Sequence, residues 1–395
     1  MVSLNNYIMA KKIGIASPFK DYNYGTVLQA FALYESLRSL GLDAEYLDYQ
    51  ASASLPIWKR VMRYVLHPSL LKERLTTKKV ENPIVSFLNS ENFEQNKVRY
   101  EDFIQQIPRS VPYDVNSIKK ADVIYDLFIV GSDQTWSPFL NDSNSLYFLN
   151  FTRNEKKVSY APSLGTSNLP DTYKTILKEK LSSFKYLSCR EKFGADLLSK
   201  LTGKKVEHVL DPTLLLQKKD WEKYEKKVEG IDADYVLVYQ LGVRPLLKDY
   251  ATKLAKKEDL EIVSILTNEY TGAWNTTFDG IGPAEFLWLI HHATYVVTDS
   301  FHGTMFSINF KKQFFSFAKV EGGRSSFDNI RLLDFLSDFD IEERLIKDVN
   351  EEPIKIDYSE VYKILNERRC VSLEYLKLIN NDMIKEISMG GVKSS

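Results

Sequence analysis

Residues 12–49 of this chain read KIGIASPFKDYNYGTVLQAFALYESLRSLGLDAEYLDY, and they indicate the class of fold. A short apolar run at 12–17 predicts a strand, and a loop rich in Asn, Tyr and Gly follows it. Apolar residues at helical spacing over 27–37 predict a helix that ends at Gly41, and 45–49 reads as a second strand. Strand, helix and strand form the βαβ unit of a parallel sheet, which places ligands at the carboxyl edge of its strands.

The alternation of strands and helices continues along the chain and then begins again. Residues 127–130 are an apolar run typical of a buried central strand, and a second series starts at 235–242. Because single cores stop growing at roughly 250–300 residues, we predict two α/β domains. The predicted parts are an N-terminal domain at 1–216 with a helical insertion at about 56–108, a C-terminal domain at 217–357, and C-terminal helices with a frayed tail at 358–395.

The composition limits the classes of function. The formal net charge of -1 over 395 residues gives no sign of nucleic-acid binding. The two cysteines, Cys189 and Cys370, are far apart in the sequence and have no histidine at metal-ligand spacing, so neither a disulfide scaffold nor a structural zinc is expected. No apolar run approaches the roughly 20 residues that cross a bilayer. We therefore expect a cytoplasmic protein without an integral membrane segment.

His302 is the histidine best placed for catalysis. It lies between an apolar strand that ends in Asp299 and an apolar helix, where a parallel sheet presents its carboxyl edge. The helix N-terminus beside it favours anions, and neighbouring charge can tune a histidine as an acid. The alternative is that His302 only caps the helix or binds a backbone carbonyl. The residues beside it that we expect to contact substrate are Ser300, Phe301, Gly303 and Thr304.

Two further loops follow predicted strands and are candidate substrate contacts. The loop residues are Asn23, Tyr24 and Gly25 in the first, and Ser132, Asp133 and Gln134 in the second. Gly25 allows a ligand to approach the backbone, and the alternative is that it only shapes a tight turn. The carboxylate and amide of the second loop suit bidentate hydrogen bonds to sugar hydroxyls, and the alternative is a capped turn.

Three cations near predicted strand ends, Arg190, Lys319 and Arg324, are candidates for binding an anion, with surface ion pairs as the alternative. Dinucleotide and P-loop glycine patterns are absent from the sequence, as are zinc-hydrolase and serine-hydrolase motifs. We expect no metal and no cofactor. His291 and His292, on a predicted helix, are expected to be structural or solvent-facing.

Several of these segments together resemble the polysaccharide pyruvyl transferase family. The segments are NYGTVLQAFALYESL at 23–37, DLFIVGSDQTWSP at 126–138, SCREKFGADLL at 188–198, VEHVLDPTLLL at 206–216 and EFLWLIHHATYVVTDSFHGTMFSINF at 285–310. The resemblance covers roughly residues 12–336 with the motifs in the right order, and the motifs are specific in combination.

The resemblance implies a GT-B-like fold, in which two Rossmann-like domains with parallel sheets face a central cleft. It also implies transfer of a pyruvyl group from phosphoenolpyruvate, as co-substrate, to hydroxyls of a nucleotide-linked or lipid-linked sugar. The product is a cyclic ketal in a bacterial exopolysaccharide or capsule. His302 is then the catalytic acid, and Arg190 matches the arginine of the family's S-x-R-[DE] segment. A lipid-linked acceptor would bring the protein to the inner face of the membrane as a peripheral protein.

One position departs from the family pattern. Many members have an arginine two residues before the catalytic histidine, and this chain has Ser300. Arg190, Lys319 or Arg324 would then have to supply the missing positive charge. Two alternatives remain at this stage: a GT-B glycosyltransferase that uses a nucleotide sugar, and a non-catalytic scaffold of a polysaccharide assembly complex.

Overall fold

The computed structural model describes most of the chain. The described residues are 11–50, 91–138, 145–242, 244–265, 274, 276–278, 280–318, 320–321, 324–325 and 329–390. Residues 56–90 of the predicted helical insertion lie outside them, and the remainder of that insertion contains helix α5 (Glu91–Ile104).

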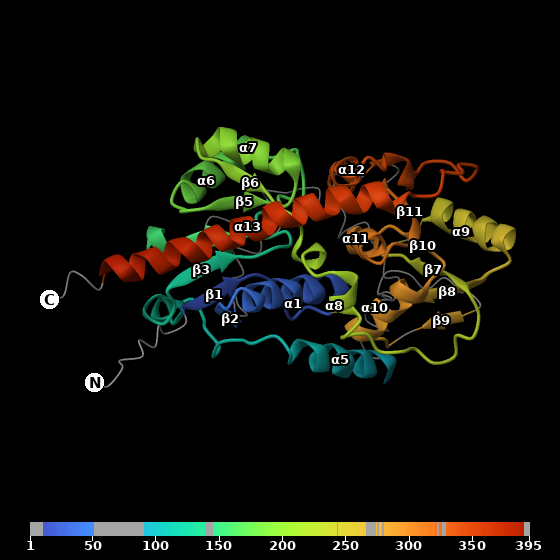
Figure 1. The fold of residues 1–395 in the computed structure, drawn as a ribbon, viewed down its shortest axis with the longest axis horizontal. Coiled ribbons are helices and arrows are strands. Elements are labelled where there is room, and N and C mark those ends of the chain that lie inside the picture. The colour runs from blue at the N-terminus through green and yellow to red at the C-terminus, as the bar shows by residue number, and fades with distance from the viewer. Residues whose placement is uncertain are drawn as a thin grey trace, which may run out of the picture.

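Two parallel sheets form the framework of the molecule (Figure 1). The first has the order β2-β1-β3-β4, with β1 (Lys12–Ala16), β2 (Asp43–Tyr46), β3 (Leu127–Val130) and β4 (Lys157–Ser159). An isolated parallel bridge between Val158 and Tyr186 continues it toward the pair β5 (Leu187–Cys189) and β6 (Val206–His208). Every pairing between the named strands of this half is parallel, as the βαβ pattern of the sequence predicted.

The second sheet has the order β14-β11-β10-β7-β8-β9, and all its pairings are parallel. Its strands are β7 (Tyr235–Tyr239), β8 (Glu261–Ile265), β9 (Thr276–Phe278), β10 (Tyr295–Thr298), β11 (Gln313–Phe317) and β14 (Leu345–Ile346). A short antiparallel pair, β12 (Val320–Glu321) with β13 (Arg324–Ser325), follows β11.

Helices connect the strands and cover the sheets. Among the described residues before α8, the helices besides α5 are α1 (Tyr24–Ser39), α6 (Asp171–Leu181) and α7 (Lys192–Thr202). The later helices are α8 (Lys218–Trp221), α9 (Pro245–Glu258), α10 (Pro283–His292), α11 (Phe301–Asn309), α12 (Asn329–Ser337) and α13 (Tyr358–Gly390). Single 3₁₀ turns include Pro212–Leu214, between β6 and α8.

The two halves share one apolar core. Trp221, which is fully buried, contacts both Phe31 of α1 and Phe306 of α11, with ring centroids 5.9 Å and 5.2 Å away. Tyr24 stacks on Phe286 of α10 with a centroid distance of 4.4 Å. Burial of this aromatic surface between helices of the two halves holds the halves together.

The long helix α13 runs from the second half back to the first (Figure 1). The guanidinium of Arg369 donates to Asn309 of α11, whereas the hydroxyl of Tyr375 donates to the carbonyl of Ser159 in β4. The sequence predicted helices from residue 358 onward, and the structure has one helix there. No helix among the described residues is long and apolar enough to cross a membrane.

Candidate active site

The carboxyl edges of the two sheets meet at two helix N-termini. Helix α1 follows β1, and Asn23 caps it by accepting a hydrogen bond from the Thr26 N–H at 3.1 Å. Helix α11 follows β10, and Ser300 caps it through the Gly303 N–H at 3.2 Å. Because both loops leave the carboxyl ends of central strands, each helix presents its N-terminus to the other half.

Gly25 and His302 are in contact across this junction. A methyl group added to Gly25 would lie only 2.1 Å from Nδ1 of the imidazole. No side chain fits in that space unless the ring moves, so glycine at this position is a packing requirement of the histidine. The sequence had suggested a close backbone approach at Gly25, and in the structure the group that approaches is His302.

His302 faces a buried carboxylate. Its Nε2 lies 3.8 Å from Oδ2 of Asp211, whose side chain is fully buried, whereas the imidazole keeps 14% of its surface exposed. Within the described part of the chain, Nε2 has no hydrogen-bond partner. A protonated imidazole here would form an ion pair with Asp211, which makes the residue suitable as an acid.

Arg190 shares that carboxylate. Its Nη1 donates to Oδ2 of Asp211 at 2.8 Å, and its side chain is 2% exposed. The guanidinium carbon lies 4.8 Å from the centroid of the Phe301 ring. Nε and Nη2 of Arg190 are buried and have no hydrogen-bond partner among the residues described. Nε lies 3.6 Å from a carboxylate oxygen of Glu191. Buried donors of this kind are rarely left unpaired, so Nη2 in particular is available to an anionic ligand.

Asp211 is the centre of this arrangement. Its Oδ1 accepts hydrogen bonds from the N–H and hydroxyl of Thr213, and its Oδ2 accepts one from the Ser132 hydroxyl at 3.0 Å. Burial raises the pKa of Asp211, but its interactions with His302 and Arg190 lower the pKa by more, and the net pKa lies well below the usual range. The same carboxylate holds the pKa of Arg190 above its usual value in spite of burial. The carboxylate is therefore ionised at neutral pH.

Asp211 was missed as a site residue by the sequence analysis, which included it only within the family segment at 206–216. The signal for it was an aspartate soon after the short β-branched run VEHVL at 206–210, which contains β6. That pattern does not show that Asp211 lies close to His302, because the two residues are far apart in the sequence.

The second candidate loop lies beside the first helix. Oδ2 of Asp133 accepts a hydrogen bond from the Thr26 hydroxyl at 3.0 Å, and Oδ1 accepts one from the Gln134 N–H at 2.8 Å. Asp133 has a φ of 76°, which a non-glycine residue rarely adopts. The loop therefore carries a half-buried carboxylate next to the N-terminus of α1. Ser132 contributes to the site through Asp211.

Other predicted residues have structural contacts. Tyr24 is buried, and its hydroxyl donates to the carbonyl of Ile281 at 3.1 Å, which places it in the packing between the halves. Thr304 is fully buried and bonded to Ser316 at 2.7 Å. A methyl group on Gly303 would lie 2.7 Å from Oγ1 of Thr298, so this glycine lets α11 pack closely on β10.

Of the three cations that the sequence analysis selected, the structure describes the side chain of one. Arg190 lies in the site, whereas Lys319 lies outside the described residues, and for Arg324 the structure describes only its backbone, in β13.

Two arginines that the sequence analysis did not select lie near residues 299–302. Arg331 of α12 has its guanidinium carbon 5.6 Å from the Phe301 ring centroid, and Arg244 has Nε 3.3 Å from Oδ2 of Asp299. Positive charge is therefore present close to Ser300, which itself caps α11.

A cavity of about 190 Å³ lies elsewhere, near the amino edge of the second sheet. Tyr295 and Gln313, the first residues of β10 and β11, contribute to its walls. It is separated from His302 by the length of those strands and does not belong to this site.

Comparison with solved structures gives matches at low sequence identity. The UDP-GlcNAc 2-epimerase from Methanocaldococcus jannaschii is 11% identical with a TM-score of 0.50, over 91% of this chain and 92% of that one. The glycosyltransferase SnogD from Streptomyces nogalater is 12% identical with a TM-score of 0.45, over 94% of this chain and 99% of that one. No curated protein matches the sequence significantly. The fold is GT-B-like, with two Rossmann-like domains, as expected from the sequence.

The chain thus combines a GT-B-like fold with a histidine, a carboxylate and a guanidinium where the edges of its two sheets meet. The sequence model of one family, described as polysaccharide pyruvyl transferase, matches residues 23–318, which is well over half of the chain. The chain belongs to the polysaccharide pyruvyl transferase family.

Proposed function

We propose that this chain transfers the pyruvyl group of phosphoenolpyruvate to two hydroxyls of a sugar and thereby forms a cyclic ketal in surface polysaccharide biosynthesis. One observation carries the proposal. His302 and Arg190 share the carboxylate of Asp211, and each keeps buried nitrogen atoms without a hydrogen-bond partner among the described residues. Family membership supports the class of reaction.

The reaction begins with proton transfer to carbon. The imidazolium of His302 protonates the methylene carbon of the enol ester, which makes the adjacent carbon electrophilic. A first sugar hydroxyl attacks that carbon, the bond to the phosphate oxygen breaks, and a second hydroxyl closes the ring. Of the two protons that the hydroxyls lose, one returns the imidazole to its charged form and the other leaves with phosphate. Asp211, ionised and 3.8 Å from Nε2, stabilises the charged imidazole between turnovers.

Arg190 binds the donor in this proposal. Phosphoenolpyruvate carries a carboxylate and a phosphate, and Nη2 of this buried guanidinium, which has no hydrogen-bond partner among the described residues, is a suitable donor for either. The N-termini of α1 and α11 add partial positive charge from the two halves. Arg331 and Arg244 supply charge near the position that is arginine in many family members and Ser300 here. No metal or cofactor takes part in the proposed steps.

The acceptor site is assigned to the loops at the same edge. Asp133, half-buried, and the adjacent Gln134 offer a carboxylate and an amide for two neighbouring hydroxyls. Asn23 is exposed at the start of α1 and can join them. The acceptor is a nucleotide-linked or lipid-linked sugar, and the reaction takes place in the cytoplasm, at the inner face of the membrane when the acceptor is lipid-linked.

Phosphate release from phosphoenolpyruvate, measured with and without candidate sugar acceptors, tests the proposal. We expect acceptor-dependent release that falls roughly 10²–10⁴-fold in His302→Gln, because a positioned general acid contributes about that factor. Lys200→Gln, on the exposed face of α7, is the control and should retain full activity.

Two outcomes would contradict the proposal. Turnover of a nucleotide sugar without phosphoenolpyruvate would make the chain a glycosyltransferase. Unchanged polysaccharide in cells that carry His302→Gln, with polysaccharide lost only when surface residues are changed, would make it a scaffold.

A further inference from the structure

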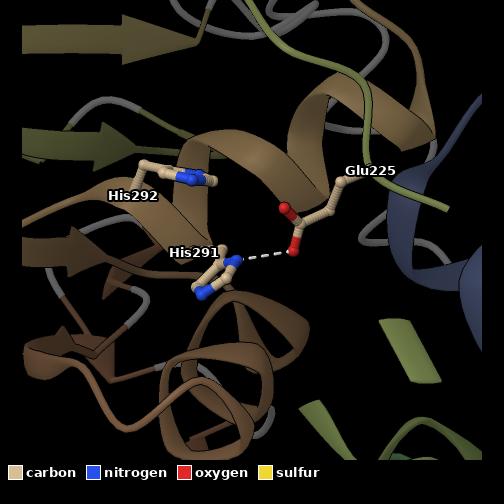
Figure 2. A group of neighbouring side chains, drawn as sticks. All are labelled: Glu225, His291 and His292. Atoms are coloured by element: carbon tan, nitrogen blue, oxygen red, sulfur yellow. Dashed lines mark hydrogen bonds and ion pairs between the residues drawn. The ribbon is translucent and has the colours of Figure 1, made fainter. Parts of the chain in front are cut away.

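Two neighbouring histidines and a glutamate form a cluster at the C-terminal end of α10, away from His302. His291 and His292 are the last two residues of that helix, and Glu225 reaches them from the segment between α8 and β7 (Figure 2). One nitrogen or oxygen donor atom from each of the three residues lies within 4.8 Å of those of the other two. The side chains of His291 and Glu225 point toward each other, with the His292 ring beside them (Figure 2).

We propose that these three residues bind a divalent transition metal ion of the zinc class. The ligands are Nδ1 of His291, a carboxylate oxygen of Glu225 and Nε2 of His292, and water completes a four-coordinate site on the exposed side. Two imidazoles and one carboxylate are a donor set suited to zinc and poorly suited to magnesium. The proposal is independent of the pyruvyl transfer reaction.

The outer contacts of both imidazoles support this assignment. A metal-bound histidine usually donates its other ring N–H to a carboxylate or a backbone carbonyl. Nδ1 of His292 lies 2.9 Å from the carbonyl of Trp288, which leaves Nε2 as the atom with a free lone pair. Nε2 of His291 lies 3.7 Å from Oε1 of Glu222, so a proton on Nε2 has an acceptor when Nδ1 binds the metal. Each imidazole thus has one nitrogen that can bind the ion and a second nitrogen close to a protein oxygen that can accept its proton.

Little movement is needed to admit the ion. Nδ1 of His291 and Oε1 of Glu225 are 2.7 Å apart, whereas two ligands of one tetrahedral zinc are about 3.4 Å apart. The ring of His291 stacks on Phe310 with a centroid distance of 4.9 Å, and that of His292 stacks on Trp288 at 4.4 Å. The rings are therefore fixed by packing, and Glu225, in a segment without regular structure, is the ligand that adjusts.

The charge around the cluster is mixed. Glu222, Glu225 and the C-terminus of α10 contribute negative charge. Lys218 lies 3.8 Å from Glu222, and the charge of Lys312 interacts with that of Glu225. These lysines oppose a bound cation. An ion at this site would link the segment between the two halves to α10, and we expect it to stabilise the fold without entering the reaction.

Calorimetric titration of Zn²⁺ into tag-free, chelator-treated protein tests the site. We expect one ion per chain, and binding at least roughly 10-fold weaker in His292→Ala and in Glu225→Gln, since even outer-shell changes cost about that much. His292 is exposed, and the amide introduced by Glu225→Gln would still accept from His291, so neither change removes core packing. Glu229→Gln, a carboxylate change in the same segment, should bind like the wild type, and Lys312→Gln should bind more tightly.

Thermal unfolding gives a second measurement. Zn²⁺ should raise the Tm of the wild type and of Glu229→Gln but not that of His292→Ala, and Mg²⁺ should have no effect. Absence of saturable binding would overturn the proposal. So would adventitious binding, recognised by equal affinity in the wild type, His292→Ala and Glu225→Gln. None of these results depends on phosphate release, so failure of this site and failure of the proposed reaction are separable.

Discussion

Asp211 and Asp334 are two carboxylates that both connect the halves of the molecule, and their surroundings are opposite. Asp211, from the first half, faces His302 of the second and is bonded to Arg190, and these contacts hold its pKa below the usual range despite burial. Asp334, on α12 of the second half, accepts a hydrogen bond at 2.7 Å from the Lys192 N–H, at the start of α7 in the first. Burial raises the pKa of Asp334 to about 6, although that hydrogen bond opposes the change.

The difference lies in the charges nearby. Among the described residues, no lysine or arginine forms an ion pair with Asp334, whereas Asp338 and Glu191 add negative charge next to it. A helix N-terminus alone does not offset burial, but a guanidinium and an imidazole together do. The junction between the halves therefore has a charge-compensated centre at the proposed active site and an under-compensated carboxylate outside it.

Asp211→Asn should have the largest effect because it breaks this centre. It removes the carboxylate that is hydrogen-bonded to the buried guanidinium of Arg190 and leaves Glu191, 3.6 Å from Nε, as the nearest counter-ion, which costs about 3 kcal/mol of unfolding free energy. It also removes the charge that stabilises a protonated His302, so we expect kcat per folded molecule to fall about 10²-fold. Denaturant unfolding and phosphate release measure the two effects.

Asp171→Asn, at an exposed carboxylate, is the control and should change neither quantity appreciably. Wild-type stability should also decline as the pH falls below about 4, because Asp211 is ionised more readily in the folded state than in the unfolded state. Asp211→Asn should weaken that decline. A kcat within twofold of the wild type would separate Asp211 from the chemistry.

Gly25→Ala should have an intermediate effect through geometry alone. The added methyl would lie 2.1 Å from Nδ1 of His302 and must displace the ring from Asp211. A displacement of about 1 Å can cost roughly 10²-fold in rate, and overpacking commonly costs about 1–3 kcal/mol. Combining the change with His302→Ala tests the cause: in that background the methyl has room, so its destabilising effect should largely disappear. An equal loss of stability in both backgrounds would place the strain elsewhere.

The sequence predicted those parts of the fold that local pattern determines. The apolar runs at 12–17 and 127–130 contain β1 and β3, and the helical pattern at 27–37 lies within α1. His302 was selected as a candidate because an apolar strand, a short polar turn and an apolar helix place it at a sheet edge. These features depend on neighbours in the chain, which a sequence shows directly.

The contacts around His302 could not be predicted in the same way. Asp211 and Arg190 meet His302 only because two sheets bring their carboxyl edges together. Tyr24 looked like a ligand contact, but its neighbours across the junction make it part of the packing. Similarly, Glu225 and His291 are 66 residues apart in the sequence, so no spacing motif signals the proposed metal site.

Asp334→Asn should have the smallest effect, and its sign should be opposite to that of Asp211→Asn. The pKa of Asp334 is about 6 in the folded state and about 3.9 when unfolded, so the folded state binds the proton more tightly. Wild-type stability should therefore fall as the pH rises from about 4 to about 6 and stay lower above that. Asparagine still accepts from Lys192 without the charge. We expect Asp334→Asn to raise the unfolding free energy at pH 7 by about 1 kcal/mol, after allowance for solvent screening. The variant should also lose most of the change in stability between about pH 4 and about pH 6. Asp334→Ala, which loses the acceptor, should show no such gain. If the two variants were equally stable at pH 7, the hydrogen bond to α7 would contribute nothing, and if Asp334→Asn were less stable than the wild type, the carboxylate would be compensated after all.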